Sequence, residues 1–422
     1  MDKDKTTIGD FCTSQNGYAF KSDTFKSDGD FKVIKIKEIK NGTVLFSKET
    51  DEVDTFDDFE KYTACKGDVL FALTGDPVSK PNPLSWVGRV SIYNHDFPSY
   101  INQRVGKIIC GDKISNKFLY YFFRQYPVFR ELAGKAKGSA SQANISTKDI
   151  LDTPIDLPSL DIQKKIVKVL SLLDDKIETN RRIISKLYSI CSHTYNNWFV
   201  CFEPYKNCNF VESEIGSIPE GWEYKPILEN EIFSLCKSKV KPFKGEKKYY
   251  ATANVDGHEL CGTPDMVTFE NRPSRAGIVP CKNSIWFARM SKSYKILNCY
   301  GASNWLSDDA IISTGFCGIT TNNEYYGFVY TYLISETFDK LKDTYATGTT
   351  QISLTNQGLE KIKVLLPPKS EIQKFSKFVA PIIEEIESCK YENMKLTETR
   401  DNLLPRLMSG EINIDKVILD YE

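Results

Sequence analysis

Basic, aromatic and amide side chains gather in a few loop-like segments of this 422-residue sequence. Residues 237–248 carry six lysines against one glutamate, and residues 289–295 carry an arginine, two lysines and a tyrosine. In the first half of the chain, the irregular segment 74–89 and the pair Gln103-Arg104 offer similar groups. Cationic side chains neutralise phosphates, and planar amide and guanidinium groups hydrogen-bond to base edges. The chemistry available to these segments is therefore the binding of duplex DNA.

We expect these segments to contact DNA as sets, because for any single lysine an ordinary solvated surface is the more common explanation. We expect loops to carry these side chains, since a loop can enter a groove of the DNA and contact both phosphates and bases. The candidate DNA contacts are Tyr18, Phe20, Lys21, Lys80, Asn82, Trp86, Arg89, Gln103, Arg104, Lys239, Lys241, Lys244, Tyr249, Arg289, Ser291, Lys292 and Tyr294.

Motifs of catalysis are missing from the sequence. Asn82-Pro83-Leu84-Ser85 has the wrong third and fourth residues for the Asn/Asp-Pro-Pro-aromatic motif of an adenine methyltransferase. Gly134–Ser139 lacks the spacing and the lysine of a phosphate-binding P-loop. Asp30 with Glu38-Ile39-Lys40 imitates a metal-dependent nuclease triad, but such a pattern arises often by chance in lysine-rich segments. We therefore predict no catalytic residue, no metal site and no cofactor bound by this chain.

Composition limits the class of protein. The chain has 41% hydrophobic residues, 26% charged residues and a net charge of −1, which suits two or three folded domains and excludes a globally basic nucleic-acid coat. No apolar run approaches the length of a membrane helix, and Met1–Lys5 lacks the apolar core of a signal peptide. The twelve cysteines and three histidines lack the spacing of zinc sites, so we interpret the cysteines as small buried hydrophobes. A reducing compartment, the cytoplasm, is the expected location.

The sequence repeats itself at a long interval. Two early segments have counterparts 216 residues later, and each copy ends in a Gly-Ser/Thr-rich turn before an apolar strand, proline and a long helical pattern. A duplicated globular unit, each copy closed by one helix, constrains the fold more than any single motif. The paired segments are Gly29–Ile34 with Gly245–Tyr250, Lys66–Ala72 with Lys282–Ala288, and the turns Gly138–Ser146 with Gly348–Thr355.

Short apolar runs between turn residues predict a mixed fold in each copy. The class is α/β (α+β), with a twisted, mainly antiparallel sheet in each of two similar tandem units. Strands are predicted at 33–36, 69–73, 90–93, 106–110, 285–288 and 310–313, and helices at 118–123 and 327–333. The expected organisation is a first unit at 1–157, a long helix at 158–202, a linker at 203–214, a second unit at 215–367, a second long helix at 368–410 and a tail at 411–422.

Both helical patterns place apolar residues at alternating spacings of three and four, as in the seam of a coiled coil. A helix over 162–199 would be on the order of 57 Å long, longer than such a domain is wide, which disfavours the alternative that each helix packs only on its own domain. We expect an antiparallel pair with a kink at Pro381, and with Asn180, Asn393 and Arg400 as polar seam residues that fix register. The apolar seam residues are Leu170, Leu173, Ile177, Ile184, Leu187, Ile382, Ile386, Leu396 and Leu403.

Several short motifs accompany this order of elements. Trp198-Phe199 closes the first helical pattern, and Ile218–Trp222 opens the second unit. Leu403–Gly410 lies near the end of the chain, and Gly17–Ser22 matches a turn common in the recognition domains of one family. In motif order and duplication, essentially the whole chain resembles the specificity subunit of Type I restriction-modification systems.

The resemblance implies a non-catalytic DNA-recognition subunit with two target-recognition domains and helices that set their spacing. It implies double-stranded DNA, two methyltransferase subunits and restriction subunits as partners, and no membrane. Adenine-N6 methyltransferase and endonuclease activities would belong to the complex, with S-adenosylmethionine and ATP on the partner subunits. Because the loops of the two units differ, we expect an asymmetric bipartite target. The alternatives are a coiled-coil interaction scaffold without DNA specificity and, less favoured, a self-contained restriction or modification enzyme.

Overall fold

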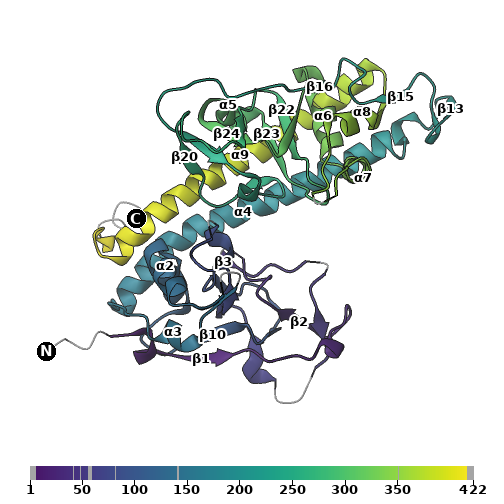
Figure 1. Ribbon diagram of the computed structural model, residues 1–422. Coiled ribbons are helices and arrows are strands. Elements are labelled where there is room, and N and C mark those ends of the chain that lie inside the picture. Colours follow the sequence, from purple (N-terminus) through teal and green to yellow (C-terminus); the bar gives the residue numbers. More distant parts are fainter. Residues whose placement is uncertain are drawn as a thin grey trace. The chain divides into compact units, whose positions relative to one another are not determined.

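The computed structural model describes residues 6–40, 42–47, 49–55, 59–80, 82–139, 142–349 and 351–415 (Figure 1). Contacts divide the chain into two compact units, Met1–Asp175 with Thr397–Glu422, and Lys176–Leu396. Each unit contains one α/β domain and part of both long helices, α4 (Leu160–Phe199) and α9 (Lys369–Met408). No helix within the described ranges is long and apolar enough to cross a membrane. Sequence features that fall outside the described residues are the start Met1–Lys5, the turn residues Ala140, Ser141 and Thr350, the loop residue Pro81 and the tail residues 416–422.

Two sheets frame the first unit. A five-stranded sheet has the order β1-β10-β6-β8-β3, and a four-stranded sheet has the order β4-β2-β9-β5. Neighbouring strands run antiparallel except for the parallel pairs β3–β8 and β2–β9. Central strand β6 is buried along its whole length, as its continuous apolar sequence predicts. The strands are β1 (Cys12–Asn16), β2 (Phe31–Ile34), β3 (Gly42–Thr43), β4 (Glu52–Val53), β5 (Thr63–Ala64), β6 (Val69–Ala72), β8 (Val90–Ile92), β9 (Ser99–Ile101) and β10 (Val105–Cys110).

Helices cover one face of the five-stranded sheet and close the core of the first unit. Phe71 of β6 meets Phe123 edge to face, with ring centroids 4.9 Å apart. Ile166 and Leu170 of α4 and Leu404 of α9 belong to the same buried cluster. A small third sheet, β11-β12-β7, lies beside this frame. Its strands and the helices are β7 (Thr74–Gly75), β11 (Lys137–Ser139), β12 (Gln142–Asn144), α1 (Asn116–Arg124), α2 (Tyr126–Gly134) and α3 (Thr147–Leu151).

The second unit repeats the four-stranded sheet and all but β3 of the five-stranded sheet, as far as the described residues extend. Its sheets have the orders β16-β25-β22-β23 and β20-β17-β24-β21, which correspond to β1-β10-β6-β8 and β4-β2-β9-β5. The parallel pair keeps its register, since Val33 faces Tyr100 in the first unit and Tyr249 faces Ile311 in the second. The predicted duplication into two tandem mixed α/β units is thus confirmed. The strands are β16 (Ser234–Leu235), β17 (Lys247–Tyr250), β20 (Asp265–Val267), β21 (Ala276–Ile278), β22 (Ser284–Ala288), β23 (Ile296–Cys299), β24 (Ala310–Ser313) and β25 (Phe316–Thr320).

Helix α6 (Tyr326–Leu333) is buried on every side, which fits a sequence that is apolar all round. It approaches α9 closely at Gly327, where a Cβ atom would lie 2.4 Å from Cγ2 of Val379. The Oγ of Ser376 accepts a hydrogen bond from the Phe328 amide at 3.1 Å. The other elements of the second unit are α5 (Trp305–Asp309), α7 (Glu336–Thr344), α8 (Asn356–Lys361), and the antiparallel pairs β13 (Phe210–Ser213) with β14 (Gly216–Pro219), β15 (Glu223–Pro226) with β26 (Lys363–Leu366) and β18 (Val255–Asp256) with β19 (Glu259–Leu260).

The long helices pair antiparallel within each unit. In the second unit, Asn180 of α4 donates a hydrogen bond to Oδ1 of Asn393 at 3.0 Å, and Ile184 shares a buried cluster with Ile386. In the first unit, Arg400 of α9 donates to Oδ1 of Asp174 at 2.7 Å. The predicted antiparallel coiled coil is confirmed, and α9 continues as helix through Pro381. Of the predicted apolar seam, Leu170, Ile177, Ile184 and Ile386 are buried, and Leu173, Leu187, Ile382, Leu396 and Leu403 are partly buried.

Candidate DNA-reading surfaces

A loop follows the central strand in each unit, and the repeated Gly-Ser/Thr turn lies against it. In the first unit, β7 at the start of this loop pairs with β12 of the turn. In the second unit, Met290 and Thr347 both form bridges to Ser353. The turn that the sequence shows twice is therefore a support for a loop rather than a linker before the helix.

The first-unit loop 74–89 is built around Trp86. Its indole is buried, donates to the carbonyl of Lys80 at 2.7 Å and packs against Phe129, with ring centroids 5.9 Å apart. Asn82 accepts the amide hydrogen of Leu84 at 3.0 Å and so caps the turn Pro83–Ser85. Lys80 is exposed. Of these predicted contacts, Lys80 alone presents its charged end to solvent, while Trp86 and Asn82 shape the loop.

Arg89 makes its hydrogen bonds inside the first unit. Its guanidinium donates to the carbonyls of Trp86 at 2.9 Å, Ile36 at 3.3 Å and Ile39 at 3.4 Å. Burial lowers the pKa of this guanidinium, and the nearby Asp76 carboxylate opposes that shift. Arg89 thus joins loop 74–89 to the segment after β2.

Five predicted contacts of the first unit lie close together, namely Tyr18, Phe20, Lys21, Gln103 and Arg104. The backbone N–H of Gln103 donates to the carbonyl of Tyr18 at 2.8 Å, and both residues are exposed, as is Arg104. The ring of Tyr18 meets Phe20 edge to face at 5.0 Å and also contacts the rings of Phe59 and Tyr62. Lys21 follows with an exposed side chain. Two segments that are more than 80 positions apart, 18–21 and 103–104, therefore present amide, guanidinium, ammonium and aromatic groups side by side.

Loop 289–295 of the second unit is held at both ends. Arg289 donates to the carbonyl of Leu354 at 2.9 Å and to Oδ1 of Asn356 at 2.8 Å, so it anchors the loop to the start of α8. The Ser291 amide donates to the carbonyl of Ile352 at 3.0 Å. Lys292 and Tyr294 project as exposed side chains. Lys342 and Asp343 of α7 also hydrogen-bond to this loop, and they could not be predicted because about 50 positions separate them from it.

The lysine-rich segment before β17 also reaches solvent. Lys239, Lys241 and Lys244 are exposed and form no ion pair within the described part of the chain. Tyr249, selected with them, is buried against Val267 and Ile311 instead. Tyr249 and Tyr250 point to opposite faces of the inner strand β17, and both faces are covered there, since the two rings belong to two different buried clusters.

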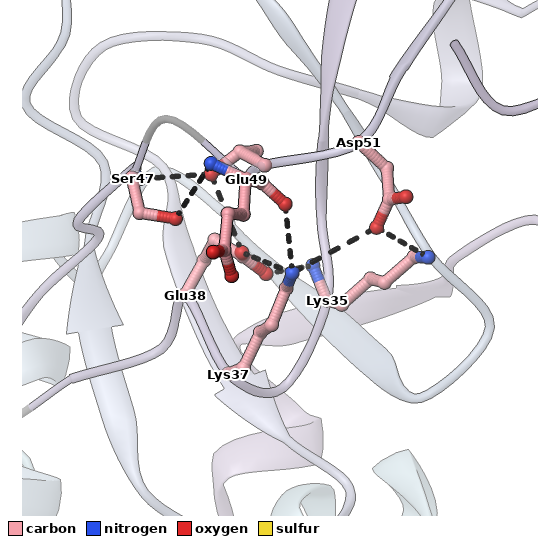
Figure 2. Close-up of polar contacts among 7 residues, drawn as sticks. Lys35, Lys37, Glu38, Ser47, Glu49 and Asp51 are labelled. Atoms are coloured by element: carbon pink, nitrogen blue, oxygen red, sulfur yellow. Dashed lines mark hydrogen bonds and ion pairs between the residues drawn. The ribbon is translucent and has the colours of Figure 1, made fainter. Parts of the chain in front are cut away.

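A second lysine-rich stretch, after β2, is neutralised within the first unit. Lys35 pairs with Asp51 at 2.7 Å, and Lys37 lies 3.8 Å from Asp51 and 3.7 Å from the buried Glu38. Figure 2 shows Lys37 between these two carboxylates. Asp30, the other acid of the nuclease-like pattern, instead accepts from Thr55. Among the described residues, no group of three or more histidines, cysteines or acids could hold a metal ion.

Glu38 gives the first unit a pH dependence. Burial raises the pKa of this carboxyl above its ordinary value of 4.5, against the opposing hydrogen bond from the Lys35 amide. A carboxyl with a raised folded-state pKa favours folding at low pH, and that contribution is lost as pH rises through the raised pKa. Glu38→Gln should therefore gain stability relative to the wild type as pH rises from 4.5 to neutrality, measured by chemical denaturation. Glu49→Gln changes an exposed residue in the same network (Figure 2), and its stability relative to the wild type should not rise with pH in this way.

Comparison with known proteins gives consistent matches. A family model described as "Type I restriction modification DNA specificity domain" matches residues 2–188 and 219–397. The Type I restriction enzyme MjaIX specificity subunit of Methanocaldococcus jannaschii is 28% identical over 346 residues, covering 78% of this chain and 76% of that protein. The HindI specificity subunit of Haemophilus influenzae is 24% identical, covering 89% and 94%. The crystal structure of a Type I restriction-modification system S subunit from M. genitalium has the same fold, with a TM-score of 0.51 and 18% identity over 96% of this chain and 95% of that one.

Proposed function

The chain belongs to the Type I restriction-modification DNA specificity family, and on that basis we propose that it is the non-catalytic subunit that reads an asymmetric, bipartite DNA target. Each α/β unit reads one half of the target. Helices α4 and α9 dock two methyltransferase subunits and, through them, restriction subunits, in the cytoplasm. The observation that carries this proposal is a pair of sheets repeated in both units, with β3 alone lacking a counterpart among the described strands, and with different loops after β6 and β22. A repeated scaffold with unlike loops suits two readers of different sequences.

In the first unit, we place the DNA contacts on Lys21, Lys80, Gln103 and Arg104, with Tyr18 beside them. Their polar ends are exposed, and Gln103 and Arg104 can each present two hydrogen-bonding groups to a base edge. Arg89, Trp86 and Asn82 act behind this surface by holding loop 74–89 in shape. Phe20 serves as packing for Tyr18.

In the second unit, Lys239, Lys241 and Lys244 are positioned for phosphates, because they are exposed and unneutralised within the described chain. Lys292 and Tyr294 are the proposed base contacts. Ser291 lies in the same loop, directly before Lys292. Arg289 and Tyr249 act as supports, since the guanidinium is bound to α8 and the phenol ring is buried.

Half-site-resolved methylation tests this division of labour. Arg104→Ala should relax discrimination at one position of the first half-site, and Lys292→Ala should do so only at the second. Loss of a base contact costs about 1–3 kcal/mol at one position, whereas loss of a phosphate contact weakens all sequences alike. The measurement is methylome sequencing of a host that expresses the full chain with its methyltransferase partner. Equal losses at both half-sites from either variant would refute the assignment.

Salt dependence separates DNA reading from a scaffold role. Phosphate neutralisation makes the logarithm of the affinity fall steeply with the logarithm of the salt concentration. Gel shifts of the methyltransferase complex on random duplex should therefore weaken strongly as salt rises, and Lys241→Ala should reduce the slope by about 1. If this chain were a scaffold that binds only proteins, Lys241→Ala would leave the salt slope of the complex unchanged. Methylation by the isolated chain would instead support a self-contained enzyme.

A further inference from the structure

The end of helix α7 lies directly behind loop 289–295. Asp343 accepts the amide hydrogen of Lys292 through Oδ1 at 2.9 Å and the hydroxyl of Tyr294 through Oδ2 at 3.1 Å. Its neighbour Lys342 donates to the carbonyl of Ser293 at 2.6 Å. Two adjacent helical residues thus bind three consecutive loop residues.

These contacts hold a conformation that the loop would not keep by itself. Lys292 has φ of 57°, in the left-handed region that non-glycine residues seldom adopt. The Lys342 side chain is 1% exposed, so its ammonium is committed to the loop carbonyl, to Asp339 at 3.7 Å and to the face of the Tyr294 ring at 4.9 Å. A buried ammonium that leaves water is retained only where such partners replace its hydration. The loop and the helix end therefore form one ordered structure.

In the first unit, the helix equivalent to α7 also supports the loop after the central strand, but through aromatic packing instead of polar contacts. Helix α2 occupies the place of α7, and its Phe129 and Tyr126 rings pack against Trp86 of loop 74–89 at 5.9 and 6.4 Å. The residues 210 positions before Lys342 and Asp343 are the buried Leu132 and Ala133. One scaffold position thus supports the variable loop in both units, by aromatic packing in one and by an ionic clamp in the other.

We propose that Lys342 and Asp343 are positioning residues that set the base preference of the second unit without touching DNA. They fix the direction in which Lys292 and Tyr294 project, and a change of direction alters which base edge these side chains meet. This inference rests on the proposed function, namely that loop 289–295 reads the second half-site.

The test compares variants of the full chain in complex with its methyltransferase partner, by selection from a duplex library. Asp343→Ala removes both acceptors and should lower discrimination at one or two positions of the second half-site at least about fivefold, with the first half-site unchanged. Asp343→Asn keeps an oxygen for the Lys292 amide and should recover most of that discrimination. Lys340→Ala, an exposed change on the same helix, should behave as the wild type.

The outcomes separate the positioning role from the proposed function. If Lys292→Ala and Tyr294→Ala alter the second half-site but Asp343→Ala does not, the positioning role is wrong and the reading role stands. If none of the three alters it, the loop does not read DNA. An Asp343→Ala variant that loses affinity equally for all sequences, or that melts at a lower temperature with no change in base preference, would show a purely structural residue and overturn the proposal.

Discussion

Replacing Arg400 by alanine should loosen the core of the first unit. Arg400 is 6% exposed and donates to Oδ1 of Asp174 at 2.7 Å, while Tyr121 donates to the other oxygen of this carboxylate at 2.7 Å. Burial, together with the Asp174 carboxylate, raises the pKa of Tyr121, so the phenol remains a donor at neutral pH. Removing one partner of a buried ion pair costs about 3–5 kcal/mol, and we expect the lower end because the Asp174 side chain is 24% exposed.

Amide hydrogen exchange locates this effect. A loss of about 3 kcal/mol in the free energy of unfolding corresponds to roughly a hundredfold faster exchange of those α1 and α9 amides that exchange only when the whole unit opens. Arg406→Ala provides a matched control on the same helix, since the ion pair of Arg406 with Glu411, which follows the end of α9, is about half exposed and should contribute under about 1 kcal/mol. Equal effects of the two arginine variants would show that the buried pair does not hold the first unit together.

The frame could be predicted because its signals are local or periodic. The strand at 69–72 is a continuous apolar run, and the offset of 216 residues relates β2 to β17 before any pairing is known. Spacing alone predicts Asn180 and Asn393 as polar seam residues, and their side chains meet at 3.0 Å. Such features can be predicted because the geometry of the chain determines which residues share one face of a helix or strand.

Roles of the basic residues could not be predicted in the same way. Arg89 and Lys80 are both basic and lie in the same loop, 74–89. Arg89 nevertheless donates to three backbone carbonyls, whereas the Lys80 side chain is exposed. A guanidinium has five donors, which suit backbone carbonyls as well as bases or phosphates. The choice depends on where the segment after β2 passes, and no local pattern in loop 74–89 encodes that path.

The apolar stripe of α9 shows the same limit. Ile372, Phe375 and Val379 continue the spacing of the seam, but they belong to a core shared with α6 as well as with Phe199 of α4. Periodicity states that a face is buried and does not identify its partner. The glycine at position 327 identifies one partner here, because it lets α6 approach the α9 backbone closely.

Adding one heptad to both long helices should lengthen the unread spacer of the target by about three base pairs. The boundary between the compact units falls after Asp175 in α4 and after Leu396 in α9, so insertions at these two points leave each unit complete. Seven residues add about 10 Å at about 1.5 Å per residue, and B-DNA rises about 3.4 Å per base pair. A heptad with isoleucine and leucine at the seam positions turns the helix face by only about 20°, so the antiparallel pairing continues.

Methylome sequencing should then find both half-sites unchanged and the distance between them increased. The insertion must enter both helices, because α4 and α9 are paired on either side of the boundary through Asp174 with Arg400 and Asn180 with Asn393. A control insertion of two residues in each helix rotates the seam by about 200° and should abolish modification rather than shift it. If the heptad variant modified DNA at the original spacing, the helices would not set the distance between the two half-sites.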